Sequence, residues 1–152
     1  LEVNNPEKEL VNLKSIIDAE IGFLSDENKN RVVFESEDIE FLIDPNDFSM
    51  IIRNLLRNAC NYSELDKEIN VNLFKDKSSI VLSVVDKGRG IATSDHERVF
   101  ERFYRVDKGR SRSLGGTGIG LSIVKHAVDR NGGLIELDSV LGSGTTFTIK
   151  FE

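Results

Sequence analysis

The stretch Thr146-Phe147-Thr148-Ile149-Lys150-Phe151 alternates polar and apolar residues near the end of the chain. Side chains of a β-strand point in turn to the two faces of a sheet, so this pattern predicts a strand with one covered face. The preceding segment 134–140 is joined to it through Leu141-Gly142-Ser143-Gly144 and is also predicted to be a strand. Two paired strands, 134–140 and 145–151, therefore close the chain.

Four more short strands are expected upstream, at residues 31–35, 39–43, 68–75 and 79–86. The last two meet at Lys75-Asp76-Lys77-Ser78, which is typical of a hairpin turn. A first amphipathic helix is expected over 7–26. Its apolar residues recur at helical spacing: Leu10, Leu13, Ile17, Ile21 and Leu24.

A second helix is predicted to begin at Asp44-Pro45, an N-cap aspartate followed by a proline at the first helical position. Its apolar face consists of Phe48, Ile51, Ile52, Leu55, Leu56 and Ala59. A third helix runs from near Gly118 to Arg130, where Asn131-Gly132-Gly133 ends it. This order of elements predicts an α/β (α+β) two-layer sandwich, with a mixed, mainly antiparallel sheet and helices on one face.

The composition limits the class of protein. The 152 residues are most simply a single domain, and 39% hydrophobic with 30% charged residues is typical of a soluble globular protein. The net charge of −6 argues against general nucleic-acid binding. No apolar run approaches the roughly 20 residues of a membrane span, and no signal peptide is expected. The single cysteine, Cys60, excludes an internal disulfide and fits a reducing compartment.

Two glycine clusters are the main candidates for ligand binding. They are Asp86-Lys87-Gly88-Arg89-Gly90-Ile91 and Gly115-Gly116-Thr117-Gly118-Ile119-Gly120-Leu121, and in both the backbone can approach a ligand closely. Between them, residues 105–112 carry four positive and one negative side chain in an otherwise acidic chain. This loop is interpreted as a mobile cover for phosphates. The spacing is not a P-loop, and no strand leads directly into the second cluster as a dinucleotide fingerprint requires.

Polar residues on the second helix and at a strand end could carry chemistry. Asn54, Asn58, Asn61 and Tyr62 form one stripe, and a carboxamide oxygen can ligate Mg²⁺; a solvated helix face is the alternative. Asp86 follows an apolar strand, where its carboxylate could accept a hydrogen bond from an adenine amino group. A turn aspartate before two glycines is the alternative interpretation of Asp86.

Together these segments resemble the ATP-binding catalytic domain of sensor histidine kinases, in the superfamily that includes gyrase, Hsp90 and MutL, whose fold is the Bergerat type. Five segments carry the resemblance: 54–63 is similar to the N box, 86–91 to the G1 box, 100–105 to the F box, 116–121 to the G2 box and 142–147 to the closing glycine-threonine motif. The resemblance is expected to cover nearly the whole chain.

The resemblance implies a site for Mg-ATP. Asn58 would ligate Mg²⁺, Asp86 would recognise adenine with Gly90 and Ile91 lining the base, and Thr145 would support the adenine end. The other residues implied to bind ATP are Asn54, Asn61, Tyr62, Gly88, Tyr104, Arg105, Lys108, Gly116, Thr117, Gly118, Ile119, Gly120 and Leu121. Asn61 stands where the family commonly has a phosphate-contacting lysine, and Lys108 or Arg105 could supply that charge.

The resemblance also implies a function that needs a second domain. The phosphoacceptor histidine of the family sits on a separate dimerising hairpin, and His96 lacks the proline of that motif. Residues 1–152 are therefore expected to be a catalytic domain without its dimerisation domain, monomeric alone, and cytoplasmic in a kinase that commonly crosses a membrane. It would transfer the γ-phosphoryl group of ATP to that domain's histidine, and a response regulator would be served indirectly.

Two alternatives come from different classes. A self-contained ATP hydrolase would resemble the gyrase and Hsp90 relatives, but these place a glutamate where Asn54 stands, and an amide cannot take up a proton near neutral pH. The same substitution disfavours a serine kinase of the anti-sigma type. A nucleotide-sensing module without transfer activity is supported only by Asn61 in place of the lysine.

Overall fold

The fold is built on one five-stranded sheet. The computed structural model describes residues 5–102, 104 and 120–152. The strands are β2 (Val32–Ser36), β4 (Ile69–Asp76), β5 (Ser79–Asp86), β7 (Gly144–Phe151) and β6 (Leu134–Val140), in this spatial order. Only the β2–β4 pair is parallel, and the other three pairs are antiparallel. The expected mixed, mainly antiparallel sheet is confirmed.

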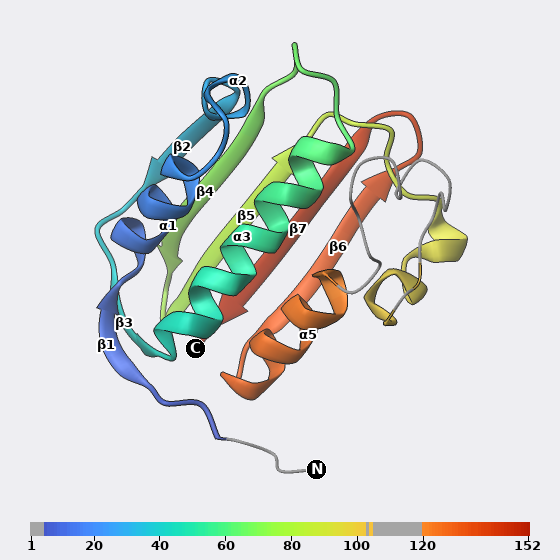
Figure 1. The fold of residues 1–152 in the computed structure, drawn as a ribbon. Coiled ribbons are helices and arrows are strands. Elements are labelled where there is room, and N and C mark those ends of the chain that lie inside the picture. The colour runs from blue at the N-terminus through green and yellow to red at the C-terminus, as the bar shows by residue number, and fades with distance from the viewer. Residues whose placement is uncertain (1–4, 103, 105–119) are drawn as a thin grey trace.

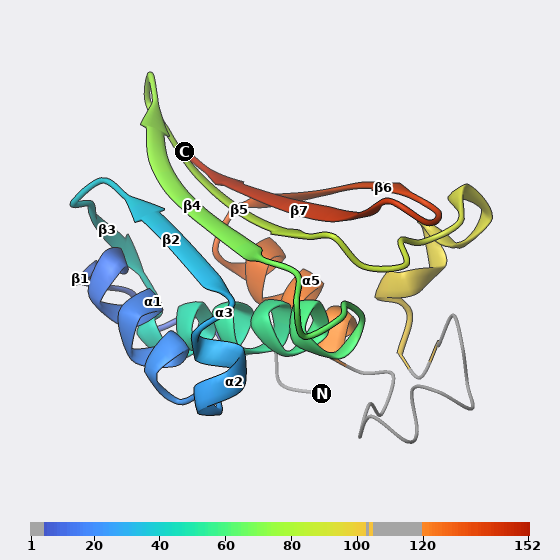
Figure 2. The ribbon, with the colours of Figure 1, turned by 90° about the horizontal axis from the view of Figure 1, so that it is seen from above.

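The helices form a second layer on one face of the sheet. They are α1 (Leu13–Gly22), α2 (Asp26–Lys29), α3 (Pro45–Asn61) and α5 (Gly120–Arg130), and two 3₁₀ turns, η1 (Thr93–Asp95) and η2 (Arg98–Phe100), lie between β5 and α5 in the chain. Figure 2 shows α1, α3 and α5 side by side beneath the curved sheet. The core between the layers includes Ile149 of β7, Ile69 and Val71 of β4 and Phe48 of α3, all buried. The two-layer arrangement is therefore confirmed.

Helix α3 begins as its sequence predicts. The Asp44 Oδ1 atom accepts hydrogen bonds from the backbone amides of Asn46 and Asp47 at 3.0 and 3.2 Å, and Pro45 occupies the first helical position. The expected apolar face is buried against the sheet: Phe48, Ile51, Ile52, Leu55, Leu56 and Ala59. The helix crosses the sheet near its middle (Figure 1).

The prediction of one helix over 7–26 is wrong at both ends. Glu9–Asn12 forms strand β1, which pairs antiparallel with β3 (Glu40–Ile43), and Asn12 then caps α1 by accepting a hydrogen bond from the Ser15 amide at 2.9 Å. Helix α1 ends at Gly22, and Ser25 caps a separate short helix, α2. Pairing with a distant strand and two local caps thus override the apolar spacing. Within the described ranges, no helix is long and apolar enough to cross a membrane.

A buried polar cluster joins the start of α3 to the end of α5. The Asn131 Nδ2 group donates to Asp47 Oδ2 and to the Ala127 carbonyl, both at 2.8 Å, and its Oδ1 atom accepts from the Asp44 amide at 3.2 Å. The Arg130 Nε atom lies 2.8 Å from Asp47 Oδ2. Gly132, with φ of 74°, then turns the chain towards β6. The expected helix end at Asn131 is therefore also a contact between two helices.

We expect Asn131→Ala to lower the free energy of unfolding by about 2–3 kcal/mol, because it leaves buried partners in both helices unsatisfied. Urea unfolding followed by circular dichroism measures this. Asn46→Ala, an exposed asparagine in the first turn of α3, is the matched control and should stay within about 0.5 kcal/mol of the parent. Equal midpoints for the two variants would contradict the role given to Asn131.

Candidate functional site

Asp86 is the centre of the candidate site. It is the last residue of β5, it is only 5% exposed, and it pairs with Thr145 across the sheet. Its Oδ1 atom accepts a hydrogen bond from the Gly88 amide at 2.9 Å, and the Thr145 amide also donates to the carboxylate. A carboxylate offers about four lone-pair sites, so these two amides leave acceptor capacity for a ligand.

Burial raises the pKa of Asp86 from 3.8 to about 6. The hydrogen bonds from Gly88 and Thr145 and the positive charge of Arg31 lower the pKa, but they do not outweigh desolvation. At neutral pH the group is mostly ionised, and it can accept a hydrogen bond from a neutral amino group. A strongly perturbed pKa at a strand end beside a glycine loop is typical of a functional site.

The glycines after Asp86 are required by the chain's own backbone. A Cβ atom at Gly88 would lie 2.0 Å from the Tyr62 carbonyl oxygen, and one at Gly90 would lie 2.2 Å from the Val140 carbonyl oxygen. The Arg89 amide donates to the Tyr62 carbonyl at 3.3 Å, which ties this loop to the end of α3. Their first role is therefore close packing, in addition to the ligand approach that the sequence predicted.

Hydroxyl groups hold the other side of this loop. Ser139 Oγ accepts from the Ile91 amide at 2.7 Å and donates to the Gly144 carbonyl at 2.8 Å. It also lies 2.9 Å from Thr145 Oγ1, and both side chains are buried. Sequence reasoning named Ile91 and Thr145 but missed Ser139. Its signal is a serine at an inward position of β6, where the alternation calls for an apolar residue.

The asparagine stripe borders the start of α5 through Asn54. Asn54 Nδ2 donates to the Met50 carbonyl at 2.8 Å, and a Cβ atom at Gly120 would be 3.1 Å from Asn54 Oδ1. The stripe therefore meets the first residue of α5. The Asn58 side chain makes no hydrogen bond within the part of the chain that the structure describes, so its amide oxygen can serve a ligand. The Tyr62 ring lies 4.6 Å from the Arg89 guanidinium.

Tyr104 is the one residue between 103 and 119 that the structure describes. Its hydroxyl donates to Asp95 Oδ1, and the Arg98 guanidinium lies 4.6 Å from its ring centroid. Tyr104 is thus anchored to η1 and η2. Gly120 and Leu121 open α5. The remaining predicted site residues lie outside the described residues: Arg105, Lys108, Gly116, Thr117, Gly118 and Ile119.

Arg31 is a second residue that sequence reasoning missed. It is 5% exposed and donates from Nε to the Lys67 carbonyl at 3.1 Å and from Nη1 to the Cys60 carbonyl at 3.4 Å. It also bonds to the side chains of Asn28 and Ser63. A cation at a helix C-terminus is favourable because the last carbonyls carry partial negative charge. No local pattern distinguishes this arginine from an exposed one at a strand start.

Comparison with known proteins places most of the chain in one family. The family described as "Histidine kinase-, DNA gyrase B-, and HSP90-like ATPase" matches residues 43–152. A sensor-like histidine kinase SenX3 of Mycolicibacterium smegmatis is 50% identical over 98 residues, 64% of this chain and 26% of that protein. The sensor histidine kinase WalK of Bacillus subtilis is 42% identical over 113 residues, 73% of this chain and 18% of that protein. The chain spans about a fifth to a quarter of the length of these relatives.

Solved structures agree on the fold. The mycobacterial sensor histidine kinase MprB aligns with a TM-score of 0.78 and 27% identity, covering 95% of this chain and 96% of that chain. The catalytic domain of histidine kinase ThkA aligns with a TM-score of 0.82 over 95% of both chains, and at 22% identity it supports the fold alone. The fold expected from the resemblance is therefore confirmed.

We expect Gly88→Ala to lower the free energy of unfolding by about 2–3 kcal/mol, because the new methyl group would overlap the Tyr62 backbone, which cannot move cheaply. Gly22→Ala is the matched control: nothing lies within 4 Å of its Cβ position, so the helix should gain up to about 1 kcal/mol. Urea unfolding of both variants measures the difference. An unchanged Gly88→Ala variant would contradict the packing described for this loop.

Proposed function

The chain belongs to the histidine kinase-, DNA gyrase B- and HSP90-like ATPase family, and from this premise we propose that it binds Mg-ATP and transfers the γ-phosphoryl group to a histidine on a separate domain. The proposal rests on the buried, mostly ionised Asp86 carboxylate beside Thr145 at the end of β5. The similarity of the chain to sensor histidine kinases along most of the chain's length supports the same function.

Adenine is proposed to bind at the end of β5. Asp86 would accept a hydrogen bond from the adenine amino group, and a buried acceptor of this kind contributes about 1–3 kcal/mol to discrimination. Gly90 and Ile91 would line the base, with Thr145 beside Asp86. Tyr62 would pack next to the nucleotide, where its ring already contacts Arg89. These residues would bind and orient the base and would take no part in bond breaking.

The phosphates are proposed to lie towards the N-terminus of α5. Gly120 and Leu121 open this helix, and free amides at a helix start favour anions. Asn54 and Asn61 would border the phosphates from α3. The covering loop would approach the phosphates with Tyr104, Arg105 and Lys108. Its later part would also contact ATP, through Gly116, Thr117, Gly118 and Ile119.

Mg²⁺ fits the donors on α3. It prefers oxygen ligands and commonly takes one or two from the protein, with phosphates and water completing the shell. The Asn58 amide oxygen is without a hydrogen-bond partner among the described residues, and it would be the protein ligand. The ion would neutralise charge on the transferring phosphoryl group. Phosphoryl transfer depends mainly on such neutralisation and on positioning, so this chain need not supply the nucleophile.

The partner and the cellular context are part of the proposal. The phosphoacceptor histidine would lie on a dimerisation domain of the same kinase, and a response regulator would receive the phosphoryl group from it. The isolated domain would be a monomer. In the full kinase it would lie on the cytoplasmic side of a membrane-anchored sensor. A hydrolase is disfavoured because the Asn54 amide donates to the Met50 carbonyl and offers no base to activate water.

In calorimetric titrations we expect ATP to bind in the presence of Mg²⁺ and to bind more weakly with EDTA, with almost no phosphate released. Asn58→Ala should reduce the difference between the two conditions, because the metal loses its protein ligand. Asn46→Ala, at the other end of α3, should leave that difference unchanged. Rapid phosphate release would favour the hydrolase. Absence of ATP binding would favour a degenerate module that no longer binds the nucleotide.

Asp86→Ala should weaken ATP binding by about 1–3 kcal/mol, roughly ten- to a hundredfold, through loss of the buried acceptor. Because the pKa of Asp86 is about 6, the parent's affinity should fall as the pH drops through 6 and the carboxylate is protonated. The ATP phosphates titrate in the same range, so the informative quantity is the ratio of the parent and variant affinities at each pH. Asp76→Ala, an exposed aspartate at the end of β4, is the control. A ratio that does not change with pH would remove Asp86 from the adenine site.

A further inference from the structure

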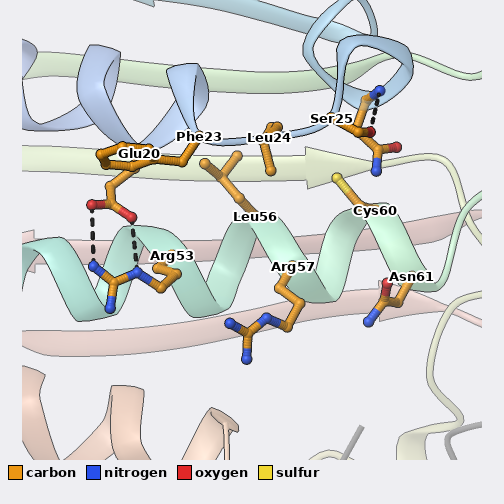
Figure 3. A pocket seen from close by; sticks show the side chains of 10 residues that line it. Glu20, Phe23, Leu24, Ser25, Arg53, Leu56, Arg57, Cys60 and Asn61 are labelled. Carbon is orange, nitrogen blue, oxygen red and sulfur yellow. Dashed lines mark hydrogen bonds and ion pairs between the residues drawn. The ribbon is translucent and has the colours of Figure 1, made fainter. Parts of the chain in front are cut away.

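A pocket lies on the outer side of α3, between this helix and the α1–α2 segment. Its volume is about 360 Å³, which is within the range of small-molecule sites. Phe23 and Leu24 line it from the end of α1, and Leu56, Arg57, Cys60 and Asn61 line it from α3 (Figure 3). Asp86 and Thr145 are not among its lining residues, so this pocket is separate from the proposed adenine site, and it shares only Asn61 with the residues proposed to border the phosphates.

Among the residues that the structure describes, one cation that lines this pocket has no charged partner. Glu20, 6% exposed, pairs with Arg53 through two contacts of 3.0 and 3.3 Å, so these two residues neutralise each other. Arg57 lies one turn further along α3 and is exposed. Within the described parts of the chain it makes neither a hydrogen bond nor an ion pair. The pocket therefore presents a positive charge that is available to a ligand.

The rest of the lining is apolar. The Phe23 side chain is 80% exposed at the rim, although it is a large aromatic group. Leu24 lies beside it on the same segment, Leu56 points towards this segment from α3, and the half-buried Cys60 thiol continues the α3 side of the pocket. A ligand that covers Phe23 removes apolar surface from water, which contributes about 25 cal/mol per Å².

We propose that this pocket binds an amphipathic anion, a small molecule with an aromatic or aliphatic body and one carboxylate, sulfonate or phosphate group. The body would lie against Phe23, Leu24 and Leu56, and the anionic group would pair with Arg57. The proposal does not depend on nucleotide binding. Asn61 lines this pocket from the last turn of α3, which is also the helix that carries Asn58.

The test uses anilinonaphthalene sulfonate, a fluorescent aromatic anion, titrated into the folded domain with and without saturating Mg-ATP. We expect saturable binding that persists with Mg-ATP. Phe23→Ala and Arg57→Gln should each weaken it by about fivefold, through loss of apolar contact and of the ion pair. The matched controls are Phe74→Ala, at an exposed aromatic residue outside the pocket, and Lys14→Gln, at an exposed cation outside it. Both should bind the dye as the parent does.

Cys60 gives an independent readout because it is the only cysteine in the chain. The dye should slow the alkylation of Cys60 by iodoacetamide, which is neutral. Arg57→Gln should slow the reaction of Cys60 with an anionic aromatic disulfide reagent more than the reaction with iodoacetamide. Unaltered dye affinity in Arg57→Gln, complete displacement of the dye by Mg-ATP, or no protection of Cys60 would each overturn the proposal.

Discussion

Helix α3 is held at both ends by buried polar groups, and the geometry of the candidate site depends on this. At its start, Asp44 and Asp47 bond to Asn131 at the end of α5. At its end, Arg31 bonds to the Cys60 carbonyl, and the Arg89 amide bonds to the Tyr62 carbonyl. A helix bonded at both ends cannot slide along the sheet without leaving buried groups unsatisfied. The distance between the asparagine stripe and the end of β5 is therefore fixed by the fold.

The same burial that makes Asp86 useful makes it unfavourable for stability. Its pKa is higher in the folded chain than the ordinary value of 3.8, so the folded state binds this proton more tightly than the unfolded state. Stability from the protonated form is therefore lost as the pH rises from about 4 to about 6. A pKa difference of about two corresponds to roughly 3 kcal/mol. This loss is large for a domain of this size, and it is consistent with a carboxylate kept for binding.

The elements that depend on neighbouring residues could be predicted from the sequence, whereas those that depend on distant pairing could not. The cap at Asp44 and the alternation of the last strands are local signals, and both predictions are confirmed. The pairing of Glu9–Asn12 depends on residues about thirty positions away, so helical spacing misled there. Arg31 was missed for the same reason, because its partners Lys67 and Cys60 lie about thirty positions along the chain. The resemblance singled out Gly88, but only the structure shows that the Tyr62 carbonyl requires a glycine at that position.

Helix α3 also explains how the two proposed sites could influence each other. One face is buried against the sheet, the asparagine stripe borders α5, and the outer face carries Arg57 and Cys60. These surfaces converge at the last turn, where Asn61 lines the outer pocket and the Tyr62 carbonyl receives the Arg89 amide. An anion paired with Arg57 would bear on this turn, and through it on the loop after Asp86. Coupling between two binding equilibria is reciprocal, so any such effect on nucleotide affinity would be matched by an equal effect of the nucleotide on the outer pocket.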